Sequence, residues 1–185
     1  AASDVYKRQY TDNTYNTKTN VIQPKSESPC IQTLIRFNRK QIVGSHKDIV
    51  DTFVGIARQA DPAEFNAQSL SMLFVGAKKY GIKYSDWQEN EEIIWNLLVN
   101  FSAILNPQGI SNVLNALNSM RCSFFNTMKK DVRSCLLSCI DRNTLQFNRQ
   151  EIAITLLAVN QMGLKWVDIN NNLQDKLLSS VDRNA

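Results

Sequence analysis

Apolar residues in the middle of the chain recur with the spacing of an α-helix. They stand at Ile110, Val113, Leu114, Leu117 and Met120. Side chains three and four residues apart lie on one face of a helix, whereas a strand directs neighbouring side chains to opposite faces. The pattern therefore predicts an amphipathic helix that begins near residue 107.

The same pattern occurs three times, which makes the chain a tandem repeat. Copies related by offsets of 40 and 42 residues share apolar residues, an asparagine and a glutamine. The matched residues are Phe65, Asn66, Gln68, Leu70, Phe74, Ala77, Tyr80 and Tyr84 in one copy, Leu105, Asn106, Gln108, Ile110, Leu114, Leu117, Met120 and Phe124 in the next, and Phe147, Asn148, Gln150, Ile152, Leu156, Val159, Met162 and Trp166 in the last. Helical repeats of about this length stack side by side, because each unit alone buries only part of its apolar surface.

Each copy contains signals for the start of a helix. Asn66, Asn106 and Asn148 stand where an N-cap is expected, since an asparagine side chain can accept a hydrogen bond from first-turn amides. Pro107 follows at the first helical position, and Glu151 lies three residues after Asn148, as in a capping box. We predict that the first helix of each copy begins directly after its asparagine.

The end of that first helix is expected to differ between copies. Gly81 and Gly163 suit the left-handed backbone conformation that commonly ends a helix. The middle copy has Arg121 at this place, so we expect its helix to end less regularly.

A triplet that starts with an aromatic residue precedes a second helix in each copy. The triplets are Tyr84-Ser85-Asp86, Phe124-Phe125-Asn126 and Trp166-Val167-Asp168. We expect the aromatic side chain to fill the junction between helices and the third residue to cap the second helix. The apolar residues of the second helices are Ile94, Leu97, Leu98 and Phe101, then Val132, Leu136, Leu137 and Ile140, then Leu173, Leu177, Leu178 and Val181.

These helix pairs predict an all-α fold, an α-solenoid of stacked helix-turn-helix repeats with a period of about 40–42 residues. The predicted units are an atypical first repeat at 31–64 and further repeats at 65–104, 105–146 and 147–185, the last of them truncated. In the first unit an apolar helical pattern spans 31–37. Its second helix is indicated by Ile49, Val50, Phe53, Val54 and Ala57.

The N-terminal part of the chain lacks an apolar period. Residues 10–30 are rich in Thr, Asn and Ser and contain Pro24 and Pro29, which predicts a polar, disordered lead-in; the alternative is a degraded repeat. Residues 1–9 resemble a translated sequencing-library adapter, and we set them aside as an artefact. The chain stops before the next Phe-Asn pair is due, so we expect a fragment open at both ends.

The repeat resembles those of known helical-repeat families. The segments that carry the resemblance are Leu105-Asn-Pro-Gln-Gly-Ile-Ser-Asn-Val-Leu-Asn-Ala-Leu117, Phe147-Asn-Arg-Gln-Glu-Ile152 and Met162-Gly-Leu-Lys-Trp-Val-Asp168. They look like the helix pairs of the octotricopeptide family and of FAST-kinase-domain organellar proteins, which implies RNA binding with each pair addressing roughly one base. They also look like tandem-repeat effectors of plant-pathogenic bacteria, which implies a protein-binding scaffold. The resemblance covers roughly residues 47–185.

Composition narrows the class of protein without assigning a ligand. The chain has 185 residues, of which 43% are hydrophobic, and no apolar run approaches the ~20 residues that a membrane span requires. The formal net charge is +4, or +3 without Lys7, Arg8 and Asp4, which is too small to indicate nucleic-acid binding by itself. We expect a soluble helical protein without a membrane partner.

Residues that could support catalysis or metal binding are sparse. There is no glycine-rich phosphate loop and no set that could serve a nucleophile, so we expect no enzymatic activity, no cofactor and no small-molecule substrate. Cys135 and Cys139 are one helical turn apart, but a metal site needs further ligands and the only histidine, His46, lies far off. We therefore interpret Cys30, Cys122, Cys135 and Cys139 as reduced structural thiols in an intracellular environment, with no bound metal.

The outward positions of the first helices supply candidate binding residues. They are Lys78, Lys79, Asn112, Asn115, Asn118, Asn160 and Gln161. Amides can pair with base edges and lysines can neutralise phosphates, which favours single-stranded RNA as the partner. However, the equivalent positions also include Met72, Val75, Ile154 and Leu157, which favour a groove for a protein partner instead. We predict a scaffold that binds single-stranded RNA through the first helices; the alternative is a protein-binding scaffold, such as a secreted bacterial effector.

Overall fold

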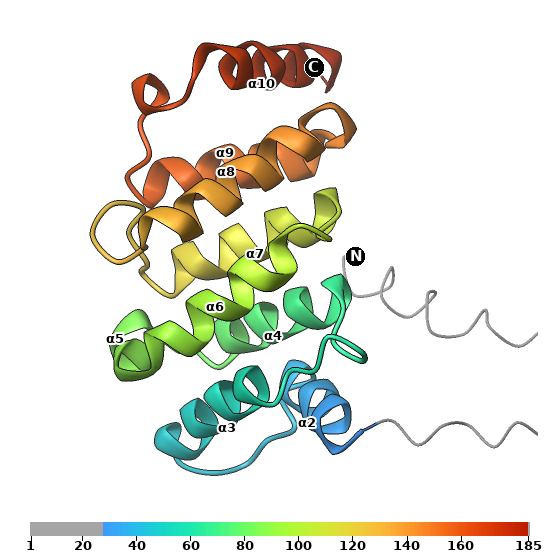
Figure 1. Ribbon diagram of the computed structural model, residues 1–185, viewed down its shortest axis with the longest axis vertical. Helices are drawn as coiled ribbons and strands as arrows, with labels where there is room; N and C mark the ends of the chain where they lie inside the picture. The colour runs from blue at the N-terminus through green and yellow to red at the C-terminus, as the bar shows by residue number, and fades with distance from the viewer. Residues whose placement is uncertain (1–27, 185) are drawn as a thin grey trace, which may run out of the picture.

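The computed structural model describes residues 28–184, and this part of the chain is helical throughout, without strands (Figure 1). Its longer helices are α2 (Pro29–Asn38), α3 (His46–Arg58), α4 (Ala67–Lys79), α6 (Glu91–Ser102), α7 (Pro107–Ser119), α8 (Lys130–Asn143), α9 (Arg149–Gln161) and α10 (Asn171–Asn184). Short turns of helix lie at α5 (Tyr84–Trp87), η1 (Gln88–Asn90), η2 (Thr144–Gln146) and η3 (Trp166–Asp168). The predicted all-α fold is confirmed.

The predicted N-terminal segments fall mostly outside the described residues. The suspected adapter at 1–9 and residues 10–27 of the lead-in are not described. Pro29 and Cys30 belong to α2, so the lead-in was drawn too long at its C-terminal end. Ser28 caps this helix through its side chain, with Pro29 at the first helical position.

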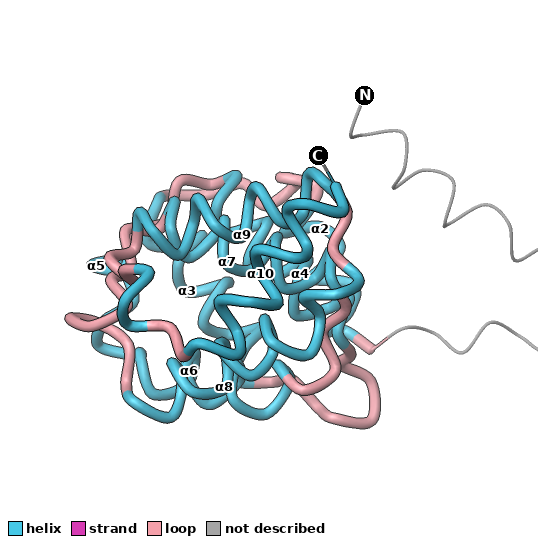
Figure 2. Tube along the Cα trace, turned by 90° about the horizontal axis from the view of Figure 1, so that it is seen from above, coloured by secondary structure: helices cyan, strands magenta, loops and turns pink. Residues whose placement is uncertain are grey.

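The helices alternate between two layers. We call α2, α4, α7 and α9 the A layer; each of them contacts the next. We call α3, α6, α8 and α10 the B layer, in which α3 contacts α6 and α6 contacts α8, while α10 packs on η2 and α9. Figure 2 looks along the stack and separates α7 and α9 from α6 and α8, and Figure 1 shows the pairs following one another in chain order. This arrangement fits the predicted stack of helix-turn-helix repeats.

The three predicted N-caps form as expected. The side-chain oxygens of Asn66 and Asn106 accept from the backbone N–H three residues on, at 3.0 Å and 2.7 Å. Asn148 accepts from the Glu151 amide at 2.9 Å, and the Glu151 carboxylate accepts from the Asn148 amide at 3.0 Å. Because these bonds satisfy orphan donors locally, each A-layer helix starts at a residue fixed by its own sequence.

The helix that ends at Arg121 was expected to be irregular, and this expectation is wrong. Arg121 has a positive φ of 62°, and Lys40 in the first pair has 59°, close to the 72° of Gly81. All four A-layer helices end with the same two backbone hydrogen bonds: for α7, Arg121 donates to Asn118 O at 2.9 Å and Cys122 to Leu117 O at 3.0 Å. Packing of the repeat imposes this end even where a side chain opposes the conformation.

The triplets join neighbouring repeats instead of capping the second helices. The backbone N–H of Tyr84 donates to Met120 O at 2.7 Å, and that of Phe124 donates to Met162 O at 2.8 Å. Each bond reaches the carbonyl at the end of the next A-layer helix. The first residue of each of the first two triplets therefore ties one repeat to its successor.

The capping role predicted for the triplet is wrong. The carboxylate of Asp86 accepts from the Lys83 amide at 2.7 Å, so it caps the short α5. Asp168 does the same for Lys165 at 3.0 Å. The B-layer helices begin several residues later, at Glu91, Lys130 and Asn171. Local capping rules found a real cap here but assigned it to the wrong helix.

The core lies between the two layers and contains most of the predicted apolar positions. Its largest fully buried side chains include Trp87, Trp95, Phe37, Phe53, Phe65, Phe74 and Phe124. In the second helices, all predicted residues of α6 are buried, Leu137 of α8 is half-buried, and Leu178 and Val181 of α10 are exposed. The prediction for α10 is therefore correct only for Leu173 and Leu177.

The ends of α8 and α10 share a motif that the repeat alignment did not use. Asn143 donates to Leu105 O at 3.1 Å, and Asn184 donates to Phe147 O at 3.0 Å. Each asparagine closes the second helix of a pair onto the residue before the N-cap of the first helix. The shared Asp-Arg-Asn ending of the two helices is the sequence signal for this contact.

Candidate nucleic-acid interface

The candidate binding residues lie on three A-layer helices. Lys78, Lys79, Asn160 and Gln161 are exposed at the C-terminal ends of α4 and α9. The three asparagines of α7, Asn112, Asn115 and Asn118, are half-buried. Because consecutive A-layer helices contact each other, these residues share one layer of the molecule.

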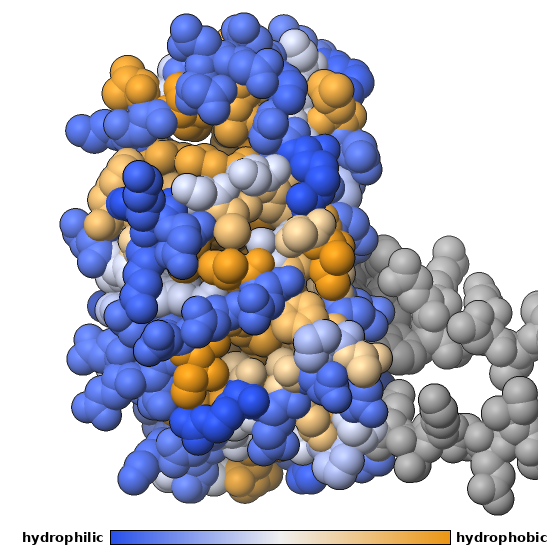
Figure 3. Space-filling model, viewed as in Figure 1, coloured by the Kyte–Doolittle hydropathy of each residue, from blue (hydrophilic) through white to orange (hydrophobic). Residues whose placement is uncertain are grey.

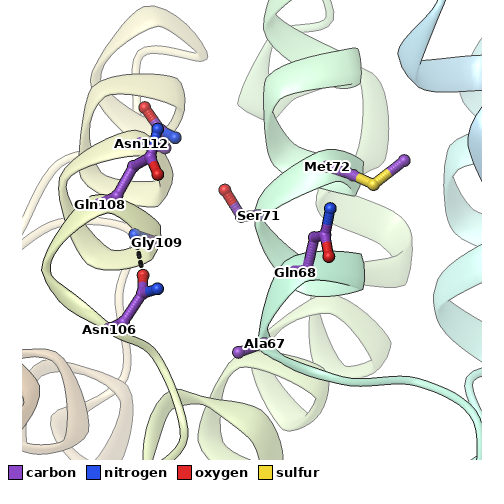
Figure 4. A pocket seen from close by; sticks show the side chains of 8 residues that line it. All are labelled: Ala67, Gln68, Ser71, Met72, Asn106, Gln108, Gly109 and Asn112. Carbon is purple, nitrogen blue, oxygen red and sulfur yellow. Dashed lines mark hydrogen bonds between the residues drawn. The ribbon is translucent and has the colours of Figure 1, made fainter. Parts of the chain in front are cut away.

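A groove of about 170 Å³ separates the N-terminal halves of α4 and α7 (Figure 4). Its lining consists of Ala67, Gln68, Ser71, Met72, Asn106, Gln108, Gly109 and Asn112. In Figure 4 the Ser71 side chain points across the groove toward α7, while Met72 points away from it. Of the predicted residues, Asn112 alone lines this groove, among further amide and hydroxyl groups that can donate or accept.

Gly109 keeps the start of α7 close to the segment before it. A Cβ at this position would stand 2.9 Å from Leu105 Cδ2 and 3.1 Å from the Asn106 side-chain oxygen. The glycine therefore lets the N-cap bond of Asn106 and the buried Leu105 coexist beside the groove.

A second cleft, of about 370 Å³, lies between the C-terminal ends of α7 and α9. It is lined by Asn118, Arg121, Cys122, Ser123, Gln161, Met162 and Gly163. The side chains of Asn118 and Gln161 meet here, with the Asn118 amide donating to the Gln161 side-chain oxygen at 2.5 Å. The sequence placed these two residues in different columns, and the structure brings them together as a bridge between repeats.

The two predicted lysines differ in their surroundings. The Lys79 ammonium donates to Asn38 O at 2.8 Å, and Asn38 in turn donates to Met72 O at 2.8 Å. Partial burial lowers the pKa of Lys79 from its ordinary value. Lys78 is exposed and has no ion-pair or hydrogen-bond partner for its side chain among residues 28–184. Lys78 is thus the lysine that remains available to a phosphate.

The candidate binding residues predicted from the sequence do not include a row of glutamines on the A layer. Gln68, Gln108 and Gln150 each occupy the second position of their helix, and all three are exposed. None of their side chains has a hydrogen-bond partner within the described part of the chain. The signal was available in the alignment, because the three copies have the same polar residue at a position that the core does not constrain.

Basic residues gather at the turns that follow the A-layer helices. They are Arg39, Lys40, Lys78, Lys79, Lys83, Arg121 and Lys165. Lys83 donates to Ser119 O at 2.8 Å and is therefore committed to the next repeat. The acidic residues at the same turns, Asp86 and Asp168, are occupied as local caps. Cations at helix C-termini are also favoured by the helix dipole, so this row alone does not identify a ligand.

The cysteines and the histidine are separate from these grooves, apart from Cys122 at the edge of the second cleft. Cys122 and Cys139 are buried, Cys30 and Cys135 are half-buried, and all four are free thiols. Burial raises the pKa of Cys122 to about 12. His46 Nε2 lies 3.0 Å from Asp86 Oδ2 at the surface. Among residues 28–184 no three His, Cys, Asp or Glu side chains converge as a metal site would need.

Two further observations bear on the class of protein. In the part of the chain that the structure describes, every helix is too short or too polar to cross a bilayer. No family model, curated protein or solved structure matches the chain.

Proposed function

We propose that the chain is a non-enzymatic helical-repeat scaffold that binds single-stranded RNA along the A layer. The observation that carries the proposal is the row of exposed glutamines at Gln68, Gln108 and Gln150, one for each of three successive helix pairs. Each side chain offers donors and an acceptor that no residue of the described chain uses. One unoccupied amide for each repeat suits a polymer that presents one similar unit after another.

The remaining A-layer residues supply complementary chemistry. Asn112, Asn115 and Asn118 line α7 with amides that can reach the edges of unstacked bases. Lys78 and Arg121 are exposed cations near the ends of α4 and α7, at positions where they can neutralise phosphates. Single-stranded RNA is favoured over a duplex, because its base edges are accessible to side chains.

The alternative is a protein-binding scaffold, which includes the effector-like function that the resemblance implies. One observation favours it: Leu157 of α9 is 57% exposed, and Met72, Val75 and Ile154 are half-buried on the same layer. Apolar side chains at these places offer a peptide contact surface but no donor or acceptor to a base. RNA and a protein partner are distinguished by direct binding measurements.

The test is fluorescence anisotropy of a labelled 20-nucleotide single-stranded RNA of mixed sequence, titrated with the full chain at several salt concentrations. Binding should weaken as salt rises, and a duplex of the same length should bind less tightly. Lys78→Glu and the double variant Gln68→Ala, Gln108→Ala should each weaken binding about three- to tenfold, because the first removes a phosphate contact and the second removes contacts to groups that every nucleotide carries.

Lys130→Glu serves as the matched control for charge. Lys130 is exposed at the start of α8 in the B layer, so its replacement changes the net charge equally without touching the A layer. Equal losses of RNA affinity for Lys78→Glu and Lys130→Glu would indicate nonspecific electrostatic binding and would contradict the A layer as the binding face. No binding at low salt would refute RNA as the ligand.

A further inference from the structure

Exposed apolar side chains concentrate in the last helix pair. Nine large apolar residues are exposed among residues 28–184, and five of them belong to α9, η3 and α10. These five are Leu157, Trp166, Val167, Leu178 and Val181. Figure 3 shows separate apolar patches on either side of the mostly hydrophilic surface at the top of the stack, where α10 lies. The last helix pair therefore exposes more large apolar side chains than the earlier pairs do.

The exposure of these side chains depends on the place of their repeat in the stack, as a comparison with equivalent residues of earlier repeats shows. Trp166 is 41% exposed, whereas Phe124, its equivalent in the preceding repeat, is 1% exposed. Val181 is 38% exposed, whereas its equivalent Ile140 is 2% exposed. The chemistry of these positions is apolar in every copy, so the difference arises because a further repeat covers the earlier ones.

One position in each layer of the last pair shows the same trend. Leu156 of α9 is half-buried, while its equivalents Phe74 and Leu114 are completely buried. Leu178 of α10 is 53% exposed, whereas its equivalents Leu98 and Leu137 are 1% exposed and half-buried. We call Leu156, Leu157, Trp166, Leu178 and Val181 the end face. Its residues come from both layers, as do those of each interface between consecutive repeats.

Within the described part of the chain, one backbone N–H group at the end face also lacks the hydrogen bond that its equivalents make. The N–H groups of Tyr84 and Phe124 donate to the final carbonyl of the next A-layer helix. The equivalent N–H of Trp166 has no acceptor among residues 28–184. This backbone donor occupies the position that the N–H groups of Tyr84 and Phe124 occupy in the existing interfaces.

Among residues 28–184, the α2 end of the stack exposes fewer apolar side chains than this face. In α2, Leu34 and Phe37 are 1% or less exposed and Ile31 and Ile35 are half-buried, while Gln32, Arg36 and the C-cap residue Arg39 are exposed. A polar outer stripe is what a terminal capping repeat carries. Head-to-tail stacking of two copies would thus set the apolar end face against a polar surface, which disfavours it.

We propose that the end face is a docking site for one further helix pair of the same repeat chemistry. The occupant would end its first helix in a left-handed residue, so that its final carbonyl accepts from the Trp166 N–H. It would place apolar side chains over Leu156, Leu178 and Val181, as the third and fourth pairs do for the positions before them. The proposal rests on continuity with the interfaces already present and is independent of RNA binding.

The test uses Trp166 as a reporter. The chain has three tryptophans, and Trp87 and Trp95 are 1% or less exposed, so iodide should quench emission from Trp166 alone. A fusion appends a second copy of residues 147–184 to the full chain, with Trp166→Phe made only in the appended copy. We expect the iodide-quenchable emission to fall at least fivefold in the fusion, and the Trp166 amide to become protected from hydrogen exchange.

Two controls make the result specific. Leu178→Lys and Val181→Lys, placed in the original pair of the fusion, should restore quenching; both residues are exposed in the chain itself, so neither change disturbs its own packing. A second fusion that appends residues 105–146 replaces the first if that one fails to fold. Trp166 that stays quenchable in every folded fusion would overturn the proposal, as would an unfused chain that buries Trp166 by forming a dimer in sedimentation experiments.

Discussion

Two leucines at the same repeat position are expected to differ in their contribution to stability. Leu114 of α7 and Leu156 of α9 are equivalent in the alignment, and replacing either by alanine removes the same three carbon atoms. Leu114 is completely buried, whereas Leu156, in the last helix pair that the structure describes, is half-buried. The two residues therefore share a repeat position but differ in their surroundings.

The magnitude follows from what each substitution leaves behind. An enclosed Leu→Ala change loses transfer free energy and leaves a cavity, which together cost about 3–5 kcal/mol in well-packed cores. At Leu156 part of the side chain is already in contact with water, and the vacated space opens to solvent, so about 1–2 kcal/mol is expected. The free energy of unfolding should therefore fall more for Leu114→Ala by at least about 1 kcal/mol.

Urea unfolding at 25 °C, followed by far-ultraviolet circular dichroism, measures both changes. The slope of free energy against urea should stay the same in both variants, because helical repeats that unfold together expose the same surface. Asn115→Ala, a polar and half-buried neighbour on α7, should cost less than about 0.5 kcal/mol and serves as the control. Equal losses for the two leucines, or a larger loss at Leu156, would refute the burial argument.

Two further changes test local features of the fold. Arg121→Gly should raise the free energy of unfolding by up to about 1 kcal/mol, because glycine adopts the positive φ of this position without steric cost. Gly163→Ala removes a glycine from the equivalent position of the last copy. The urea midpoints of the two variants should therefore shift in opposite directions. Burial raises the pKa of Cys122 to about 12, so the unfolded chain loses this proton first. The stability that comes from keeping the thiol neutral is complete below about pH 9 and is lost between about pH 9 and 12. In Cys122→Ala the urea midpoint should therefore fall less steeply over that range than in the unmodified chain. Equal slopes of urea midpoint against pH in the two proteins would contradict this expectation.

Features set by neighbouring residues in the chain could be predicted from the sequence. The caps at Asn66, Asn106 and Asn148 depend on bonds to residues three positions away, so the local pattern was sufficient. The left-handed ends at Gly81 and Gly163 were predicted for the same reason. Local rules locate the first helix of each pair to within a residue or two.

Features set by contacts between repeats could not be predicted from one copy. The pairing of Asn118 with Gln161, and the bond from Lys79 to Asn38, join residues that are more than 40 positions apart. The exposure of Trp166 depends on which repeat follows it, a property that its own sequence does not contain. Burial at a repeat position is therefore a property of the stack.

The same reasoning separates two kinds of A-layer position under the proposed function. Gln68, Gln108 and Gln150 are exposed, so packing does not require their identity in three copies. A residue that stays constant without a packing constraint suits a feature common to every unit of the ligand. The column formed by Lys78, Asn118 and Asn160 is not constant, because one copy has a lysine where the other two have an asparagine. If RNA binds along this layer, the glutamines would contact what all nucleotides share, Lys78 would neutralise a phosphate, and the asparagines would contact base edges.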